Sequence, residues 1–174
     1  MKPAVFLDRD GVLNEIVVRA GEPGSPRSLE EFQTAPDLSD VLRLGKAGLL
    51  LFIVTNQPDV ARGLIAPSVV VAMIDRIRTR VPVDDFRICT HEDADGCGCR
   101  KPKPGMIMDL AHFWRVDLDR SFVVGDTWRD VDAARAAGCR SILIRRPYNT
   151  GVVADAYADT LGAAVDLVLE HHGR

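Results

Sequence analysis

Five short apolar runs, rich in β-branched and aromatic residues, alternate along this chain with amphipathic segments. The runs are Ala4–Leu7, Leu49–Val54, Phe86–Cys89, Ser121–Val124 and Ser141–Ile144. The segments with helical spacing of apolar residues are Asp37–Ala47, Pro67–Arg80, Gly105–Trp114, Trp128–Ala137 and Thr160–Glu170. Strands that alternate with helices favour a parallel sheet covered on both faces. The sequence therefore predicts an α/β fold with a Rossmann-like parallel sheet.

Length and composition limit the class further. The 174 residues fit one domain, spanning residues 1–174, and a hydrophobic share of 47% excludes a disordered chain. Every apolar stretch falls short of the ~20 residues that a membrane span requires. A net charge of −3 and only 6% aromatic residues argue against nucleic-acid binding. We expect a monomer with neither a membrane nor a nucleic-acid partner.

Carboxylates follow two of the expected strands. Asp8 and Asp10 come after the first strand, and Asp126 comes after the fourth. The carboxyl ends of parallel strands share the edge where α/β sheets bind ligands. A carboxylate can attack phosphorus, but its charge opposes an anionic substrate, so a cation such as Mg²⁺ is needed between them. From these residues alone the alternative stays open that the acids only cap turns or a helix.

Two further segments carry groups suited to phosphate. Thr55 ends the second strand and is followed by Asn56 and Gln57, so a hydroxyl and free backbone N–H groups are available there. Arg100 and Lys101 precede a helix and offer fixed cations for the charge of a transition state. Taken singly, the first segment is also typical of a turn and the second of a solvated basic loop.

The order and spacing of these four segments resemble the haloacid dehalogenase-like (HAD) phosphohydrolases from residue 4 to about residue 146. The resemblance implies that Asp8 is the nucleophile and Asp10 the general acid and base. It also implies that Thr55 and Lys101 stabilise the transferred phosphoryl group. The expected fold is then a HAD core without a large cap domain, because 174 residues leave no room for one.

The same resemblance implies a Mg²⁺ site. Its ligands are the carboxylates of Asp8 and Asp126 and the backbone carbonyl of Asp10. Asp130 lies one helical turn beyond Asp126 and is expected next to the ligands rather than on the metal.

Cysteine and histidine cluster in one loop. Cys89, His91, Cys97 and Cys99 have the spacing C-x-H…C-x-C, which supplies a full tetrahedral set for Zn²⁺. Four protein ligands leave no open position, so we expect a structural zinc. Thiolate ligands indicate a reducing compartment, and we expect the protein to be cytoplasmic. The alternative is buried free thiols beside a surface histidine, and Cys139 is expected to be ordinary core.

The zinc-binding loop ends directly before the cations. Cys99 is followed at once by Arg100 and Lys101, and zinc would fold residues 92–96 into a rigid flap beside them. We therefore expect the metal to position these cations and so to affect activity.

This loop narrows the resemblance to the D-glycero-D-manno-heptose 1,7-bisphosphate phosphatases, in the histidinol-phosphatase-like HAD-IIIA subgroup. The similar segments are 8–14, 55–57, 61–63 and 99–106. The resemblance implies Mg²⁺-dependent release of the C7 phosphate from a small phosphorylated sugar through an aspartyl phosphate. It also implies substrate contacts from Asn56, Gln57 and Arg100.

The chain departs from that pattern at two places that bear on substrate contacts. Pro58-Asp59 stands where a Ser-Gly type pair is usual, and Glu15–Ser28 lacks a tyrosine-containing stretch. Arg27 and Arg62 are candidate contacts for a second phosphate, although both also fit ordinary surface arginines. Three alternatives stay open: a histidinol-phosphate phosphatase, a polynucleotide 3′-phosphatase and a non-catalytic zinc module.

Overall fold

The computed structural model describes residues 1–173, and its largest feature is a six-stranded parallel sheet. The strands are β1 (Ala4–Leu7), β2 (Val17–Arg19), β3 (Glu22–Gly24), β4 (Leu50–Asn56), β5 (Asp85–Cys89), β6 (Phe122–Gly125), β7 (Arg140–Ile144) and β8 (Ala156–Ala158). The α-helices are α1 (Leu42–Lys46), α2 (Pro67–Arg78), α3 (Gly105–Trp114), α4 (Trp128–Ala137) and α5 (Leu161–His172). The sheet has the order β5-β4-β1-β6-β7-β8 with every pair parallel. This confirms the α/β prediction.

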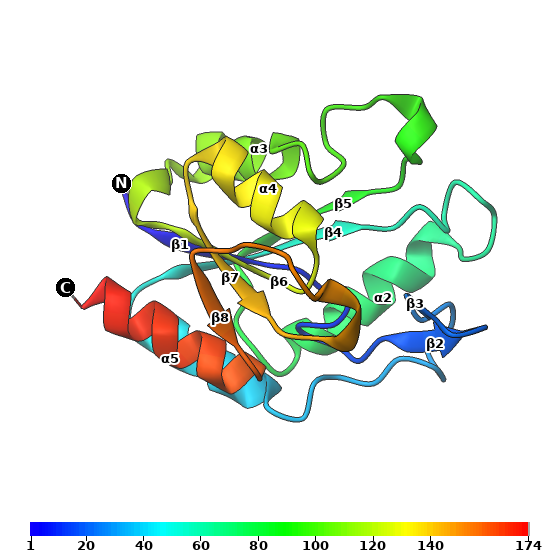
Figure 1. Cartoon of the computed structure of the whole chain (residues 1–174), viewed down its shortest axis with the longest axis horizontal. Helices are drawn as coiled ribbons and strands as arrows, with labels where there is room; N and C mark the ends of the chain where they lie inside the picture. The colour runs from blue at the N-terminus through cyan, green and yellow to red at the C-terminus, as the bar shows by residue number, and fades with distance from the viewer. Residues whose placement is uncertain (174) are drawn as a thin grey trace.

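Helices cover both faces of the sheet. Val5 and Leu7 of β1 pack in one buried cluster with residues of α1, α2 and α5. Ala4 and Phe6 pack in a second cluster with residues of α3 and α4. Successive strand residues point to opposite faces, so an uninterrupted apolar run such as β1 is what a doubly covered strand requires. Figure 1 shows α3 and α4 on one face and α2 and α5 on the other.

The direction of the strand order changes at β1. The chain passes from β1 to β4 and β5 on one side, then returns to β6, β7 and β8 on the other. A crevice forms beyond the carboxyl ends of strands at such a switch point. Asp8 directly follows β1, and its neighbours β4 and β6 end beside it with Asn56 and Gly125. The topology thus gathers the ends of all three strands at one place.

Two elements differ from their expected extents. Residues 37–47 form a 3₁₀ turn, Leu38–Val41, followed by the short helix α1, rather than one continuous helix. Strand β8 pairs with β7 at the edge of the sheet and was not expected. Its three residues, Ala-Tyr-Ala, are too short to give a recognisable apolar run.

The loop 15–28, for which no structure was expected, contains the antiparallel hairpin β2–β3. Ala20 and Gly21 both have positive φ, 51° and 83°, as a two-residue type I′ turn requires. The hairpin lies apart from the main sheet, beside α2 (Figure 1). Residues 1–173 hold no large cap, and none of their helices has the length and apolarity to span a membrane.

Candidate active site

A buried lysine contacts the expected nucleophile. Nζ of Lys101 lies 2.9 Å from Oδ1 of Asp8 and 2.6 Å from Oδ1 of Asp130, and it donates to the carbonyl of Val54 at 2.9 Å. Its side chain is only 3% exposed. Burial alone would lower the pKa of Lys101, but the charges of Asp130 and Asp8 outweigh it and raise the pKa. Lys101 therefore stays charged and fixed at the floor of the site.

Three carboxylates share this position. Oxygen atoms of Asp8, Asp126 and Asp130 all lie within 4.8 Å of one another. Burial and then the charge of Asp130 raise the pKa of Asp126 to about 7 and raise that of Asp8 well above its usual value. Crowded carboxylate oxygens are the donor set that Mg²⁺ takes, and a bound cation would relieve their repulsion. The residues present therefore fit a Mg²⁺ ion.

Asp130 is engaged elsewhere. Its Oδ1 accepts from Lys101, and its Oδ2 accepts from the backbone N–H of Thr127 at 3.0 Å and from the Thr127 hydroxyl at 2.7 Å. The bond from the Thr127 N–H is one half of the capping box that begins α4, and in the other half the Thr127 side chain accepts from the Asp130 N–H. Asp130 therefore holds Lys101 and the start of the helix, and its expected place beside the metal ligands stays a prediction.

The turn after Asp10 depends on Gly11. Gly11 has φ +77°, and a Cβ atom there would lie 2.0 Å from Oδ2 of Asp126. Asp126 is also held by two residues that follow β7, because Tyr148 donates its hydroxyl to Oδ2 and Asn149 donates to the backbone carbonyl at 2.8 Å. Only glycine allows the β1 loop to approach Asp126 this closely.

Asp10 accepts hydrogen bonds from four side chains. Arg9, which is fully buried, contacts it at 2.8 Å, and Asn14, Ser25 and Gln57 donate at 2.9, 2.7 and 2.8 Å. Burial would raise the pKa of Asp10, but Arg9 and these hydrogen bonds outweigh it, so the pKa is lowered. In the metal-free protein Asp10 is therefore an ionised, firmly oriented carboxylate.

The two amides after Thr55 have positioning contacts. Asn56 lines the pocket, and its amide both donates to the Lys101 carbonyl at 3.0 Å and accepts from the Lys101 N–H at 3.1 Å. Gln57 is buried and donates to Asp10 and to Oγ1 of Thr55 at 2.9 Å. Their substrate contacts stay predictions, whereas their roles in orienting Lys101, Asp10 and Thr55 follow from these bonds.

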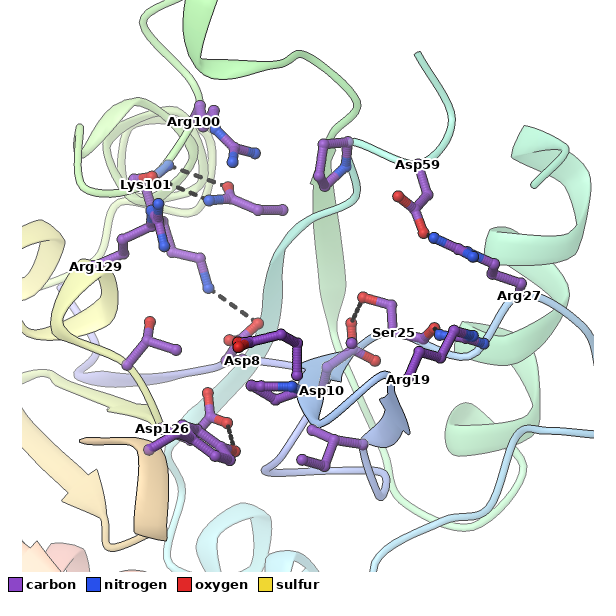
Figure 2. A pocket seen from close by; sticks show the side chains of 18 of the residues that line it. Asp8, Asp10, Arg19, Ser25, Arg27, Asp59, Arg100, Lys101, Asp126 and Arg129 are labelled. Atoms are coloured by element: carbon purple, nitrogen blue, oxygen red, sulfur yellow. Dashed lines mark hydrogen bonds and ion pairs between the residues drawn. The ribbon is translucent and has the colours of Figure 1, made fainter. Parts of the chain in front are cut away.

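A cavity of about 480 Å³ opens above these groups. Asp8, Asp10 and Asp126 lie at its centre (Figure 2). Its charged and polar walls include Arg19, Glu22, Ser25, Arg27, Asp59, Arg62, Arg100, Thr127, Arg129 and Tyr148. This opening is lined by several cations and fits a small, strongly anionic ligand.

The cysteine–histidine cluster is assembled as expected. Cys89 Sγ lies 3.3 Å from Cys99 Sγ, 3.7 Å from Cys97 Sγ and 3.5 Å from His91 Nδ1. Cys99 Sγ lies 3.5 Å from Cys97 Sγ and 3.4 Å from His91 Nδ1. Sulfurs around a tetrahedral zinc lie about 3.8 Å apart, given Zn–S distances of ~2.3 Å. The four side chains are therefore compatible with one zinc ion.

Three functional neighbours were missed by sequence reasoning. In the sequence Asp-Arg-Asp, Arg9 is typical of a solvent-exposed charged residue. Tyr148 lies more than twenty residues from Asp126, so the sequence does not connect the two. Arg129 follows Trp128 inside a helix and gives no signal of its own, yet it lines the cavity. Of the three, only Arg9 could have been suspected from the sequence, since an arginine between Asp8 and Asp10 at a strand end can neutralise the charge of one of these carboxylates.

Comparison with known proteins shows both family and structural likeness. Residues 98–171 match a family model described as HAD-hydrolase-like. The chain is 43% identical to D-glycero-β-D-manno-heptose-1,7-bisphosphate 7-phosphatase of Rhodopseudomonas palustris, covering 79% of this chain and 80% of that protein. It is 34% identical to the α-heptose 7-phosphatase of Mycobacterium tuberculosis, covering 90% and 86%. A crystal structure of D,D-heptose 1,7-bisphosphate phosphatase from Bordetella bronchiseptica, with magnesium and phosphate, superposes with a TM-score of 0.84 at 32% identity, covering 98% of this chain and 99% of that one.

Proposed function

Since this chain belongs to the HAD-like family of phosphatases that includes the heptose bisphosphate 7-phosphatases, we propose that it removes the C7 phosphate from D-glycero-D-manno-heptose 1,7-bisphosphate. One observation carries the proposal. Asp8 lies against the buried cation of Lys101 at the floor of an arginine-lined cavity, with Asp126 beside it. A nucleophilic carboxylate, a fixed cation and a metal-ligating acid are what phosphoryl transfer requires.

Asp8, Asp126 and the backbone carbonyl of Asp10 would hold Mg²⁺, which when bound supplies positive charge that lets an anionic carboxylate approach a phosphate. Asp130 would keep Lys101 in place beside them. The four zinc ligands would hold a structural Zn²⁺ at the loop that leads into Arg100 and Lys101.

Asp8 attacks phosphorus in line, and the bond from phosphorus to the sugar oxygen breaks. Asp10 gives a proton to the departing oxygen, and an aspartyl phosphate remains on Asp8. Water then attacks that phosphorus and gives a proton to Asp10, while the bond from phosphorus to the Asp8 oxygen breaks. Inorganic phosphate leaves, and the carboxylate of Asp8 is free again. Thr55 and Lys101 donate hydrogen bonds to the phosphoryl oxygens throughout.

The lowered pKa of Asp10 bears on both steps. The ionised form, favoured by Arg9, is ready to take the proton from water in the second step. In the first step Asp10 must be protonated, because it gives a proton to the departing oxygen. The protonation state of Asp10 therefore links the two steps of the reaction.

We also propose that the chain acts as one domain, in the cytoplasm and as a monomer. The reducing cytoplasm keeps Cys89, Cys97 and Cys99 available as thiolates for zinc.

The test is phosphate release from a panel of both anomers of heptose 1,7-bisphosphate, histidinol phosphate and 3′-phosphorylated DNA. We expect a heptose bisphosphate to be hydrolysed with the highest kcat/KM. Faster hydrolysis of histidinol phosphate or of DNA ends would contradict the proposal. Asp8→Asn should remove turnover of every substrate, and substantial activity of that variant with Mg²⁺ would contradict the assigned nucleophile.

A further inference from the structure

Arginines line the cavity on two opposite sides. Figure 2 shows Arg100 and Arg129 on the side of Lys101, and Arg19 and Arg27 across the opening, beside Ser25. A bisphosphate brings one phosphate to Asp8 and must place its second phosphate elsewhere. The two sides differ in how much positive charge they leave available for it.

The side formed by the hairpin is neutralised. Arg19 is paired with Glu31, and Nε of Arg27 lies 2.8 Å from Oδ2 of Asp59. The other oxygen of Asp59 contacts Arg62 at 3.2 Å. Asp59 is therefore clamped between two guanidinium groups.

Further carboxylates neutralise the remaining positive charge on the hairpin side of the cavity. Arg62 also pairs with Glu92 at 2.5 Å, so Arg19, Arg27 and Arg62 face three carboxylates. Glu22 lines the cavity as well, without an ion pair among residues 1–173. The hairpin side thus carries no surplus positive charge for a second phosphate.

The opposite side does carry a surplus. Within residues 1–173, Nε of Arg129 is buried and has no hydrogen-bond partner. The guanidinium lies over the Trp128 ring at 4.8 Å, and its nearest acid is Asp93 at 3.9 Å. Asp93 is already bound by Arg100 at 2.6 Å and is 70% exposed. One solvated carboxylate therefore serves two guanidinium groups.

This arrangement suits an incoming phosphate. A buried donor without a partner costs free energy until an acceptor arrives, and a phosphate accepts two N–H groups of a guanidinium at once. Asp93 can return to water when it is displaced, because its carboxylate is exposed. Stacking on Trp128 keeps the Arg129 fork oriented before the ligand binds.

Resting on the proposed function, we infer that Arg129 binds the phosphate that is not removed, next to Arg100, whose substrate contact the family resemblance already implies, and that Arg129 is a specificity-determining residue. Arg129 stands three residues after Asp126, at the start of α4. The helix therefore fixes the span between the reacting phosphate and the second one, which selects the length of the sugar bisphosphate.

The test compares kcat/KM for the heptose 1,7-bisphosphate with kcat/KM for the same sugar carrying only the 7-phosphate. In Arg129→Gln the ratio of the two should fall about 10- to 100-fold, with most of the loss in KM for the bisphosphate. Arg129→Lys keeps the positive charge but loses the two parallel N–H donors of the guanidinium. Its ratio of kcat/KM values should lie between those of the wild type and Arg129→Gln. Arg19→Gln, on the opposite side, is the matched control and should keep the wild-type ratio.

Thermal midpoints and zinc content verify that each variant is folded. An unchanged ratio in folded Arg129→Gln, or an equal fall in Arg19→Gln, would overturn the inference while leaving the proposed function intact. A wild-type enzyme that does not hydrolyse the bisphosphate, or shows no preference for it over the monophosphate, contradicts the inference. Failure of the proposed function itself is recognised separately, from the wild-type rates on the substrate panel.

Discussion

Nζ of Lys101 lies 2.6 Å from Oδ1 of Asp130, a residue twenty-nine positions further along the chain. The approach of α4 that makes this contact is possible only because Gly125 has no side chain, since a Cβ atom there would lie 2.1 Å from Cβ of Asp130. Lys101 is thus held between Asp130 and the expected nucleophile Asp8. The same ion pairs therefore contribute to the stability of the fold and to the proposed reaction.

Lys101→Ala should both destabilise the protein and suppress turnover. The change leaves the buried carboxylates of Asp8 and Asp130 without a cation, which should lower the free energy of unfolding by about 3 kcal/mol or more. Loss of a fixed donor to the phosphoryl group should lower kcat by about 10²–10³-fold. Urea unfolding and steady-state kinetics measure the two effects. Lys46→Ala, at an exposed position of α1, should change neither, and a stable Lys101→Ala variant would contradict the prediction.

Asp10→Asn should separate the two halves of the reaction. An aryl phosphate with an acidic leaving group needs no proton from Asp10, so Asp8 should still become phosphorylated. Water attack then lacks its base, and the aspartyl phosphate should accumulate. Rapid mixing with p-nitrophenyl phosphate should show a burst of about one nitrophenolate per active site, followed by a much slower rate. A linear time course at the wild-type rate would show that Asp10 is not the base.

Mg²⁺ affinity should rise with pH up to about 7. In the metal-free protein, burial and the charge of Asp130 raise the pKa of Asp126 to about 7, against ~3.9 in an unfolded chain. Folding therefore takes up a proton between these values, and the contribution of Asp126 to stability falls as the pH rises from about 4 to about 7. Mg²⁺ needs the ionised carboxylate, so its binding must release that proton.

The measurement is calorimetric titration with Mg²⁺ at pH 5.5, 6.5 and 7.5 in buffers of different ionisation enthalpy. Affinity should change by up to about tenfold per pH unit below pH 7 for each proton released. The exposed Asp109→Asn serves as a control and should keep the same dependence. Affinity that stays constant over this range would refute the prediction.

Cys99→Ser should lose the zinc and, with it, much of the activity. Cys99 stands next to Arg100 and Lys101, so a loosened loop should release both cations from their positions. We expect zinc content to fall from one ion per chain to near zero and kcat/KM to fall about 10- to 100-fold. Cys139→Ala removes a buried cysteine outside the cluster and should keep the zinc. Full activity of zinc-free Cys99→Ser would contradict a positioning role for the metal.

The central sheet was predictable because its strands are buried on both faces. Each of the five expected runs became a strand, and β1, β4 and β6 in the middle of the sheet are apolar because both of their faces are covered. Strands β8, β2 and β3 were not predicted because each has only three residues, too few for a recognisable pattern. Pro23 and Gly24 in β3 even argue against a strand, and there the pairing with β2 overrides local preference.

The site divides in the same way. Asp8 and Asp126 could be placed together because they follow parallel strands whose ends meet at one edge, whereas Lys101, in the loop before α3, was placed by the family resemblance. The hydrogen-bond partner of Asp126 could not be predicted, since Tyr148 reaches it through a contact between distant segments that no spacing encodes. The charge balance at Asp59 depends on the same kind of contact between distant segments.

The hairpin β2–β3 belongs to no other sheet within residues 1–173, yet Ser25 at its end donates to Asp10. A segment that adds no strand to the main sheet therefore helps to orient the carboxyl group of Asp10. Exchange of this hairpin for another of equal length, with the serine retained, would alter the wall of the cavity opposite Arg129 while the orientation of Asp10 is kept. Loops of this kind can vary while the sheet that carries the reacting groups stays the same.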